Sequence, residues 1–129
     1  MRVLLDTHVL YWAVRSPKRI PTEASELITD PASELLVSVV TPWEMGIKHR
    51  KGRFPDAGPF LGAFTQHMAH LRARELPITG EHSLFAGQLE WAHRDPFDRM
   101  LAAQAIIENA VLVSADGAFA SLGGLRTAW

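Results

Sequence analysis

The chain has 129 residues, 47% of them hydrophobic, and a formal net charge of −1 at pH 7. This length suits one domain with its own core, so we expect residues 1–129 to form a single domain. The absence of cysteine excludes a disulfide scaffold and a thiolate metal site. The charge balance excludes a strongly basic nucleic-acid-binding protein, so such a role would need a local basic patch or a metal.

The N-terminal residues form no signal-peptide pattern, and no apolar run approaches the roughly 18 residues of a membrane span. We therefore expect a cytoplasmic protein without a membrane segment.

The first forty residues contain two short apolar strands, predicted over residues 2–5 and 35–40. Continuous apolar strands of this kind belong to sheets that are covered on both faces. Asp6 comes directly after the first strand. Between the strands, apolar spacing predicts a helix over residues 7–14 and a second helix that starts at the N-cap Thr22 and ends at residues 30–31.

The second strand leads directly into a helix that begins with Thr41-Pro42-Trp43-Glu44. Thr41 and Glu44 fit a capping box, which would place the acid in the first turn. The helix is expected to run to about Arg50 and to stop at Gly52. Lys48 and Arg50 belong to a basic run that exceeds what the helix dipole needs, so we interpret them as candidate phosphate contacts.

The middle of the chain is predominantly helical. A helix over residues 60–71 is expected to present its apolar side to a core or a dimer partner. Residues 75–78 are too short and too proline-marked for a central strand, so we expect an edge strand or a linker. A further helix over residues 81–91 is expected to pack through one face, formed by Leu84, Phe85, Gln88 and Leu89.

The next helix start, at Asp95, is the clearest one in the chain. Asp95 is a good N-cap, and Pro96 falls at the first helical position, where a missing N–H costs nothing. Asp98 then lies near the positive end of the helix dipole. An apolar strand follows over residues 111–114, and Asp116 comes two residues later. A last, short strand is expected at residues 125–127.

Short apolar strands that alternate with helices predict a mainly parallel sheet with helices on both faces, an α/β architecture. Right-handed crossovers place the carboxyl ends of the strands on one edge, where α/β proteins have their functional crevice. Asp6, Glu44 and Asp116 should therefore face the same edge. Asp98 can join them if its helix runs in the right direction past the sheet.

Clustered carboxylates repel one another unless a cation lies among them. No lysine or arginine is adjacent to Asp6 or Glu44 in the sequence, so we expect a divalent cation. Carboxylate ligands without cysteine favour Mg²⁺ or Mn²⁺. Such ions activate water and stabilise the leaving oxygen in phosphodiester hydrolysis.

Four segments together resemble a known family. They are residues 4–8, 38–44, 93–105 and 112–116, and they follow the order of the PIN-domain nucleases of the VapC type, the toxins of bacterial toxin–antitoxin pairs. The long third segment is quite specific, and the others support it. The resemblance implies a PIN-like three-layer α/β/α fold and a metal-dependent endoribonuclease that acts on RNA. It also implies a VapB-like antitoxin and a homodimer.

The resemblance further assigns residues to the site. Asp6, Glu44, Asp98 and Asp116 match the family's acidic quartet. Thr7 and Ser114 match positions where a hydroxyl supports the metal shell. Asp95 matches a family residue that we interpret as a structural cap. For Arg99, two roles stay open: a phosphate contact or an ion pair with an acid.

Two other functions are compatible with an α/β fold. In a non-catalytic binding module, the acids would only cap helices. A signalling receiver would need paired acids after its first strand and a late lysine, whereas Asp6 stands alone and no lysine follows Lys51. The apolar faces at residues 24–27 and 60–71, with Trp12 and Trp43, look like more than one small sheet can cover, which favours a homodimer.

Overall fold

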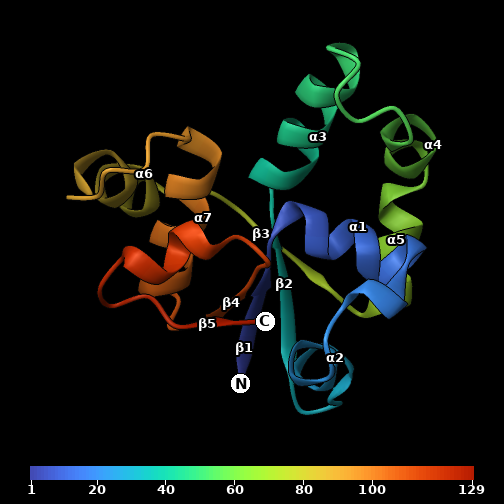
Figure 1. Cartoon of the computed structure of the whole chain (residues 1–129), viewed down its shortest axis with the longest axis horizontal. Coiled ribbons are helices and arrows are strands. Elements are labelled where there is room, and N and C mark those ends of the chain that lie inside the picture. The colour runs from blue at the N-terminus through green and yellow to red at the C-terminus, as the bar shows by residue number, and fades with distance from the viewer.

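A single parallel sheet runs through the centre of the molecule (Figure 1). The structure is a computed structural model and describes residues 1–129. The strands are β1 (Arg2–Leu5), β2 (Glu34–Ser38), β3 (Arg74–Leu76), β4 (Val111–Val113) and β5 (Thr127–Ala128). They lie in the order β3-β2-β1-β4-β5, and every neighbouring pair is parallel. The predicted parallel sheet is confirmed, with β3 as the edge strand expected near residue 75.

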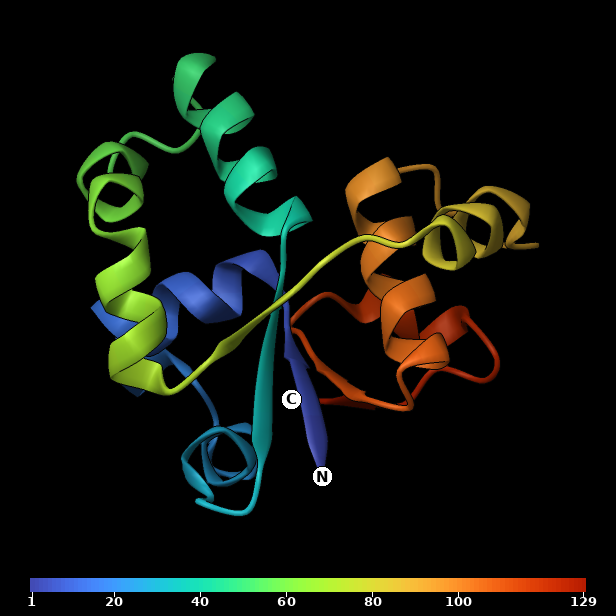
Figure 2. The same ribbon diagram turned by 180° about the vertical axis from the view of Figure 1, so that it is seen from behind.

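Helices cover both faces of this sheet (Figures 1 and 2). They are α1 (Thr7–Arg15), η1 (Pro17–Arg19), α2 (Thr22–Thr29), α3 (Val40–Arg50), α4 (Ala57–Gly62), α5 (Phe64–Leu71), α6 (Gly80–Gln88), α7 (Pro96–Ile107) and η2 (Gly117–Ser121). Elements α1, α2, α4 and α5 lie on one side, and α6 and α7 lie on the other. This three-layer α/β/α arrangement confirms the expected fold. None of the helices is both long and apolar enough to span a membrane.

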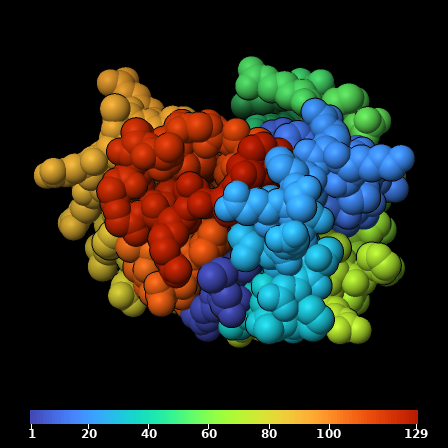
Figure 3. Space-filling view, turned by 60° about the horizontal axis from the view of Figure 1, so that its bottom comes forward, coloured from blue at the N-terminus to red at the C-terminus, as the bar shows by residue number.

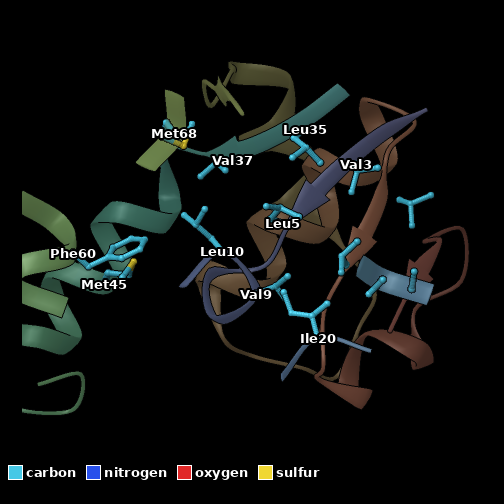
Figure 4. Packing of buried hydrophobic residues seen from close by; sticks show 14 of the residues in the cluster. Val3, Leu5, Val9, Leu10, Ile20, Leu35, Val37, Met45, Phe60 and Met68 are labelled. Atoms are coloured by element: carbon cyan, nitrogen blue, oxygen red, sulfur yellow. The ribbon is translucent and has the colours of Figure 1, made fainter. Parts of the chain in front are cut away.

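The strands are buried on both faces because alternate residues enter different cores. Val3, Leu5 and Val113 belong to the larger core, which includes Phe60 and Met68 from the covering helices. Figure 4 shows this packing, with Phe60 and Met45 beside Leu10 of α1. On the other face, the central residues of β1, β2 and β4 pack against the alanine-rich side of α7; these include Leu4, Leu36, Leu112, Ala102 and Ala105.

The strand order creates a switch point between β1 and β4. The chain moves outward from β1 to β2 and β3, then returns to the other side of β1 to form β4 and β5. Only residues 108–110 separate the end of α7 from β4. The start of α7 therefore lies at the carboxyl edge of the sheet, the upper edge in Figure 2. This direction, left open by the sequence, brings Asp98 to the same edge as Asp6.

Two expected helices differ in extent. The helix expected over residues 60–71 is divided into α4 and α5 at Ala63, which has φ −113°. The helix expected over residues 81–91 ends at Gln88, and its predicted packing face is wrong. Leu84 and Phe85 are 69% and 37% exposed, whereas α6 buries His82 and Ala86.

The helix starts also differ from expectation in two cases. Thr22 is not an N-cap, because α2 begins at Thr22 and Pro21 precedes it without a side-chain cap. The capping box at Thr41 is wrong, because α3 already begins at Val40, whose N–H donates to Ser38 Oγ at 3.1 Å. The Asp95 cap is confirmed: its carboxylate accepts from the first-turn N–H groups of α7.

Of two further predicted boundaries, the end of α3 agrees with the structure and the position of the last strand does not. The stop of α3 is confirmed, and Gly52 has the left-handed φ of +70°. The last strand lies at Thr127–Ala128, later than expected.

Candidate active-site cleft

A cleft of about 430 Å³ opens at the carboxyl edge of the sheet. The residues that line it come from the ends of β1 and β4, from one side of α1 and of α3, and from the start of α7. They are Asp6, His8, Trp12, Glu44, Lys48, Asp95, Asp98, Ala115 and Asp116. The cleft thus brings together all four acids that the sequence singled out, from segments separated by up to 110 residues.

Asp6 lies at the switch point and is tied to β4. Its backbone N–H donates to Val113 at 3.0 Å, which continues the β1–β4 pairing by one residue. Its carboxylate accepts from the Ser114 hydroxyl and from the Thr7 N–H, both at 2.6 Å. Burial raises the pKa of Asp6, and these two hydrogen bonds oppose part of the rise. Ser114 therefore holds the carboxylate in one orientation across the switch point.

Glu44 is buried one turn inside α3 and has two partners. It accepts from the Thr7 hydroxyl at 2.7 Å and from the Lys48 ammonium at 2.5 Å. The Thr7 hydroxyl lies 3.2 Å from that of Thr41, so this hydroxyl pair lies beside the acid. These contacts explain why Thr41 and Glu44 form no capping box: both side chains turn toward α1 instead.

Lys48 overturns the expectation that no lysine or arginine partners the acids. That expectation considered only residues adjacent in the sequence, whereas a helix brings residues four positions apart onto one face. Burial acts to lower the pKa of Lys48, but the hydrogen bond and charge of Glu44, with Asp95 and Asp98 nearby, outweigh it and raise the pKa. Lys48 therefore lines the cleft as a positively charged side chain.

Asp98 is the acid of the cleft whose pKa is raised most clearly. Burial, followed by the nearby charges of Asp95, Asp6 and Glu44, raises its pKa to about 6, although a hydrogen bond with His93 opposes the rise. The His93 Nε2 atom lies 2.7 Å from Asp98 Oδ2. His93 was not among the predicted site residues. Its position just before the Asp95 cap was the signal that could have identified it.

Asp116 is exposed at the mouth of the cleft. It caps η2 by accepting from the Ala118 N–H at 2.9 Å, which leaves its second oxygen free of a protein partner. One ligand atom each of His93, Asp98 and Asp116 lie within 4.8 Å of one another. This spacing lets a single cation contact all three, so the residues present fit a metal ion.

Arg99 forms no ion pair with an acid, which was one of its two expected roles. Its guanidinium donates to four backbone carbonyls, those of Ala86, Leu89, Trp91 and His93, at 2.6–3.3 Å. It therefore fixes the connection between α6 and α7, and with it the position of His93. Of the other basic candidates, Lys48 lines the cleft, whereas Arg50 is exposed at the end of α3 and does not.

The apolar faces that predicted a homodimer are largely covered within the chain itself. Ala24, Phe60 and Met68 are buried in the larger core. Trp43 is different, since it is 61% exposed and packs edge-on against Phe97. The buried side chains of Ala24, Phe60 and Met68 complete the chain's own core, so the prediction that they form a dimer surface is wrong.

Comparison with known proteins gives consistent results. The PIN domain family matches residues 3–125. Ribonuclease VapC22 of Mycobacterium tuberculosis is 34% identical over 115 residues, which cover 88% of this chain and 86% of that protein.

Several solved structures share the fold. VapBC2 from Rickettsia felis, bound to a DNA fragment from its promoter, contains a chain that matches with a TM-score of 0.72 and 18% identity, over 99% of this chain and 98% of that one. VapBC-1 from nontypeable Haemophilus influenzae matches with a TM-score of 0.68 and 23% identity, over 99% and 97% of the two chains.

Proposed function

This chain belongs to the PIN domain family, and we propose that it is an endoribonuclease toxin that hydrolyses phosphodiester bonds in RNA. The observation that carries this proposal is the cleft in which four acids, from four separate segments, converge at the switch point of the sheet. The curated relative that is named as a ribonuclease supports the choice of RNA as the substrate.

We propose that Asp6, Glu44, Asp98 and Asp116 hold a divalent cation, Mg²⁺ or Mn²⁺. Carboxylate oxygens are the ligands that these ions prefer. Burial and, after it, the charges of neighbouring acids raise the pKa of Asp98, and a cation would relieve the repulsion among these acids. When bound, such an ion activates water and stabilises the leaving oxygen of the phosphodiester. The chain's own contribution is to hold the carboxylates in place, through the hydroxyls of Thr7 and Ser114.

The remaining basic candidates have unequal support. Lys48 reaches the cleft and carries the positive charge that an RNA phosphate needs, so we keep it as a phosphate contact. Arg50 lies outside the cleft and could contact only a more distant part of the RNA. Arg99 is occupied by backbone carbonyls and is not proposed as a contact.

The partners follow from the relatives. The similar solved structures named above are of VapBC proteins, and VapBC-5 from Mycobacterium tuberculosis, which also shares the fold, is described as a member of a family of toxin–antitoxin systems. We propose that a VapB-like antitoxin inhibits this chain, and that the chain acts in the cytoplasm as a single nuclease domain. A homodimer stays a prediction that rests on the family likeness alone.

The competing function is a non-catalytic module whose acids only cap helices. Asp6, Asp95 and Asp116 do cap α1, α7 and η2. Glu44 and Asp98, however, accept no hydrogen bond from a helix start, and Glu44 is buried. Capping therefore does not explain these two acids, and this favours the nuclease.

The test is cleavage of total cellular RNA by the purified chain with Mg²⁺, with Mn²⁺ and with EDTA, followed by sequencing of the new ends. We expect metal-dependent cuts at a defined set of sites. Asp6→Asn serves as the matched control because it keeps the shape of the side chain. Equal cutting by the parent and Asp6→Asn would mean a contaminating nuclease, and no cutting with either metal would contradict the proposal.

A further inference from the structure

One wall of the cleft is aromatic. His8 and Trp12 both line it, one turn apart on α1, so that the two rings lie on the same face of that helix. Their ring centroids are 5.9 Å apart. His8 is exposed and Trp12 is partly exposed. The acidic cleft therefore has an aromatic surface directly beside it, which the nuclease chemistry proposed above does not use.

Neighbouring side chains hold these two rings in place. Phe54 stacks on His8 with centroids 5.5 Å apart and an interplanar angle of 19°. Trp129 lies 5.7 Å from Trp12, and the dark red C-terminal residues meet the blue surface of the N-terminal helices in Figure 3. The Arg19 guanidinium lies over the Trp12 ring, 4.5 Å from its centroid. The wall is thus a supported row of rings with a cation at one side.

The charge of the cleft makes such a wall useful to an RNA-binding enzyme. Five acids and one lysine line the cleft, so a phosphate backbone gains little attraction there without a metal. Stacking of a base on an aromatic ring does not depend on charge and is available to every base. Aromatic rings beside the reacting centre can therefore hold RNA where charge does not.

We propose that an unpaired base of the RNA substrate stacks on the surface formed by His8 and Trp12 while its strand enters the cleft. Arg19 supports the Trp12 ring and supplies a cation on that side for the backbone. A base inside a duplex cannot reach this surface, so the wall selects single-stranded RNA or loops. This inference rests on the proposed function and deepens it, since it names the side chains that hold a base of the RNA beside the acids of the cleft.

Trp43 provides a matched control. It is the more exposed tryptophan, at 61%, but it does not line the cleft and its ring packs on Phe97. If exposed tryptophans bound RNA non-specifically, Trp43→Leu would weaken binding as much as Trp12→Leu. If the wall is the stacking site, Trp12→Leu weakens RNA binding and Trp43→Leu does not.

The experiment measures binding of a labelled single-stranded RNA of about ten nucleotides, a length within the range that such grooves hold. An abasic oligonucleotide of the same length keeps the phosphates and removes the bases. Fluorescence anisotropy in EDTA gives the Kd without cleavage, and steady-state cleavage in Mg²⁺ gives KM and kcat. The proteins are the parent, Trp12→Leu, Trp12→Phe, His8→Ala and Trp43→Leu.

We expect Trp12→Leu to weaken binding of the normal RNA about tenfold, and His8→Ala to weaken it less. Trp12→Phe, which keeps a ring, should retain most of the affinity. The abasic RNA should bind the parent weakly, and neither substitution should weaken it further. In cleavage, KM should rise while kcat changes little, which a merely structural role would not produce.

The outcomes separate this inference from the proposed function. A parent that cleaves RNA but binds normal and abasic RNA equally, or binds neither, overturns the stacking site alone. A parent that prefers RNA with bases yet cleaves nothing supports the stacking site and contradicts the nuclease. If Trp12→Leu does not fold, the exposed His8→Ala and the abasic RNA still decide the question.

Discussion

Three acids of the cleft are each held by different side chains. The hydroxyls of Ser114 and Thr7 orient Asp6 and Glu44, Lys48 neutralises Glu44, and His93 contacts Asp98. No lysine or arginine forms an ion pair with Asp98, and burial, together with the three acids around it, raises its pKa to about 6. At the residue scale, Asp98 is therefore the acid whose ionised form is most destabilised by its surroundings in the cleft.

The first prediction concerns Asp98→Asn in EDTA. The Asp98 carboxyl has a pKa of about 6 in the folded chain, against an ordinary value of 3.8. The folded state therefore binds its proton more tightly, and this group lowers the free energy of unfolding as the pH rises from about 4 to 6. Asparagine does not ionise, so the free energy of unfolding of the variant does not fall in this way as the pH rises. We expect the variant to be more stable than the parent at pH 7 by on the order of 1 kcal/mol, after allowance for solvent screening.

Urea unfolding at several pH values checks this prediction. The gain should disappear below about pH 4, where the parent carboxyl is protonated in both states. In a separate assay with Mg²⁺, RNA cleavage by the variant should be abolished at every pH. Glu26→Gln, which changes an exposed acid in the middle of α2, is the matched control and should show neither effect. A variant that cuts RNA as fast as the parent would show that Asp98 is not needed.

The second prediction concerns Ser114→Ala. This change removes the hydroxyl that donates to Asp6 at 2.6 Å and leaves a buried carboxylate oxygen without its partner. We expect unfolding to become easier by about 1–2 kcal/mol and metal affinity to fall, because the carboxylate loses its fixed orientation. Calorimetric titration with Mn²⁺ measures the second effect. Ser83→Ala, at an exposed position of α6, controls for the loss of a hydroxyl; equal effects of the two changes would contradict the role of Ser114.

At the scale of elements, helix starts and packing faces were predictable where the contacts that determine them are close in the sequence. The Asp95 cap was predictable because donor and acceptor are only two or three residues apart. The packing face of α6 was not, because His82 is buried through a contact with Glu108, 26 residues away. The capping box of α3 failed for the same reason: Thr7 of another helix holds Glu44. The local pattern therefore predicted the start of α7 correctly, whereas at α3 a distant side chain competed with the predicted cap.

The third prediction concerns the connection between α6 and α7. Arg99 donates to four carbonyls there, and a lysine has neither the reach in several directions nor the planar fork to replace those bonds. We expect Arg99→Lys to lower the free energy of unfolding by about 2–3 kcal/mol and to speed amide hydrogen exchange over residues 86–95. Arg94→Lys, in the same segment but exposed, is the control. Unchanged exchange in this segment would contradict the anchoring role.

At the scale of the whole molecule, topology explains why much of the site could be predicted. Parallel strands end on one edge, so the acids that follow β1, β2 and β4 had to meet there. What could not be predicted depends on side-chain partners across the cleft, such as Lys48 and His93. The prediction that apolar helix faces form a dimer surface was wrong for a related reason. The side chains of Phe60 and Met68 pack into the chain's own core, and the sequence does not show that contact.

The last prediction tests the cleft through the stability of the whole fold. A cation that binds only the folded chain stabilises it by mass action, by about 2.7 kcal/mol at a hundredfold excess over its Kd. For a domain of this size, that corresponds to a rise in Tm of roughly 5–10 °C. We expect Mg²⁺ or Mn²⁺ to raise the Tm with concentration, and Asp6→Asn to remove most of the rise. Glu26→Gln should keep it, because this exposed acid lies outside the cleft.

Calorimetry in EDTA and in increasing Mn²⁺ measures this shift, and a second feature makes it specific. Lys48 neutralises Glu44 in the metal-free cleft, so part of the charge that a cation would meet is already balanced. Lys48→Met should therefore leave Glu44 unpaired, lower the Tm in EDTA and enlarge the rise produced by Mn²⁺. Identical melting curves for the parent in EDTA and in excess Mn²⁺ would instead favour acids that serve only as helix caps.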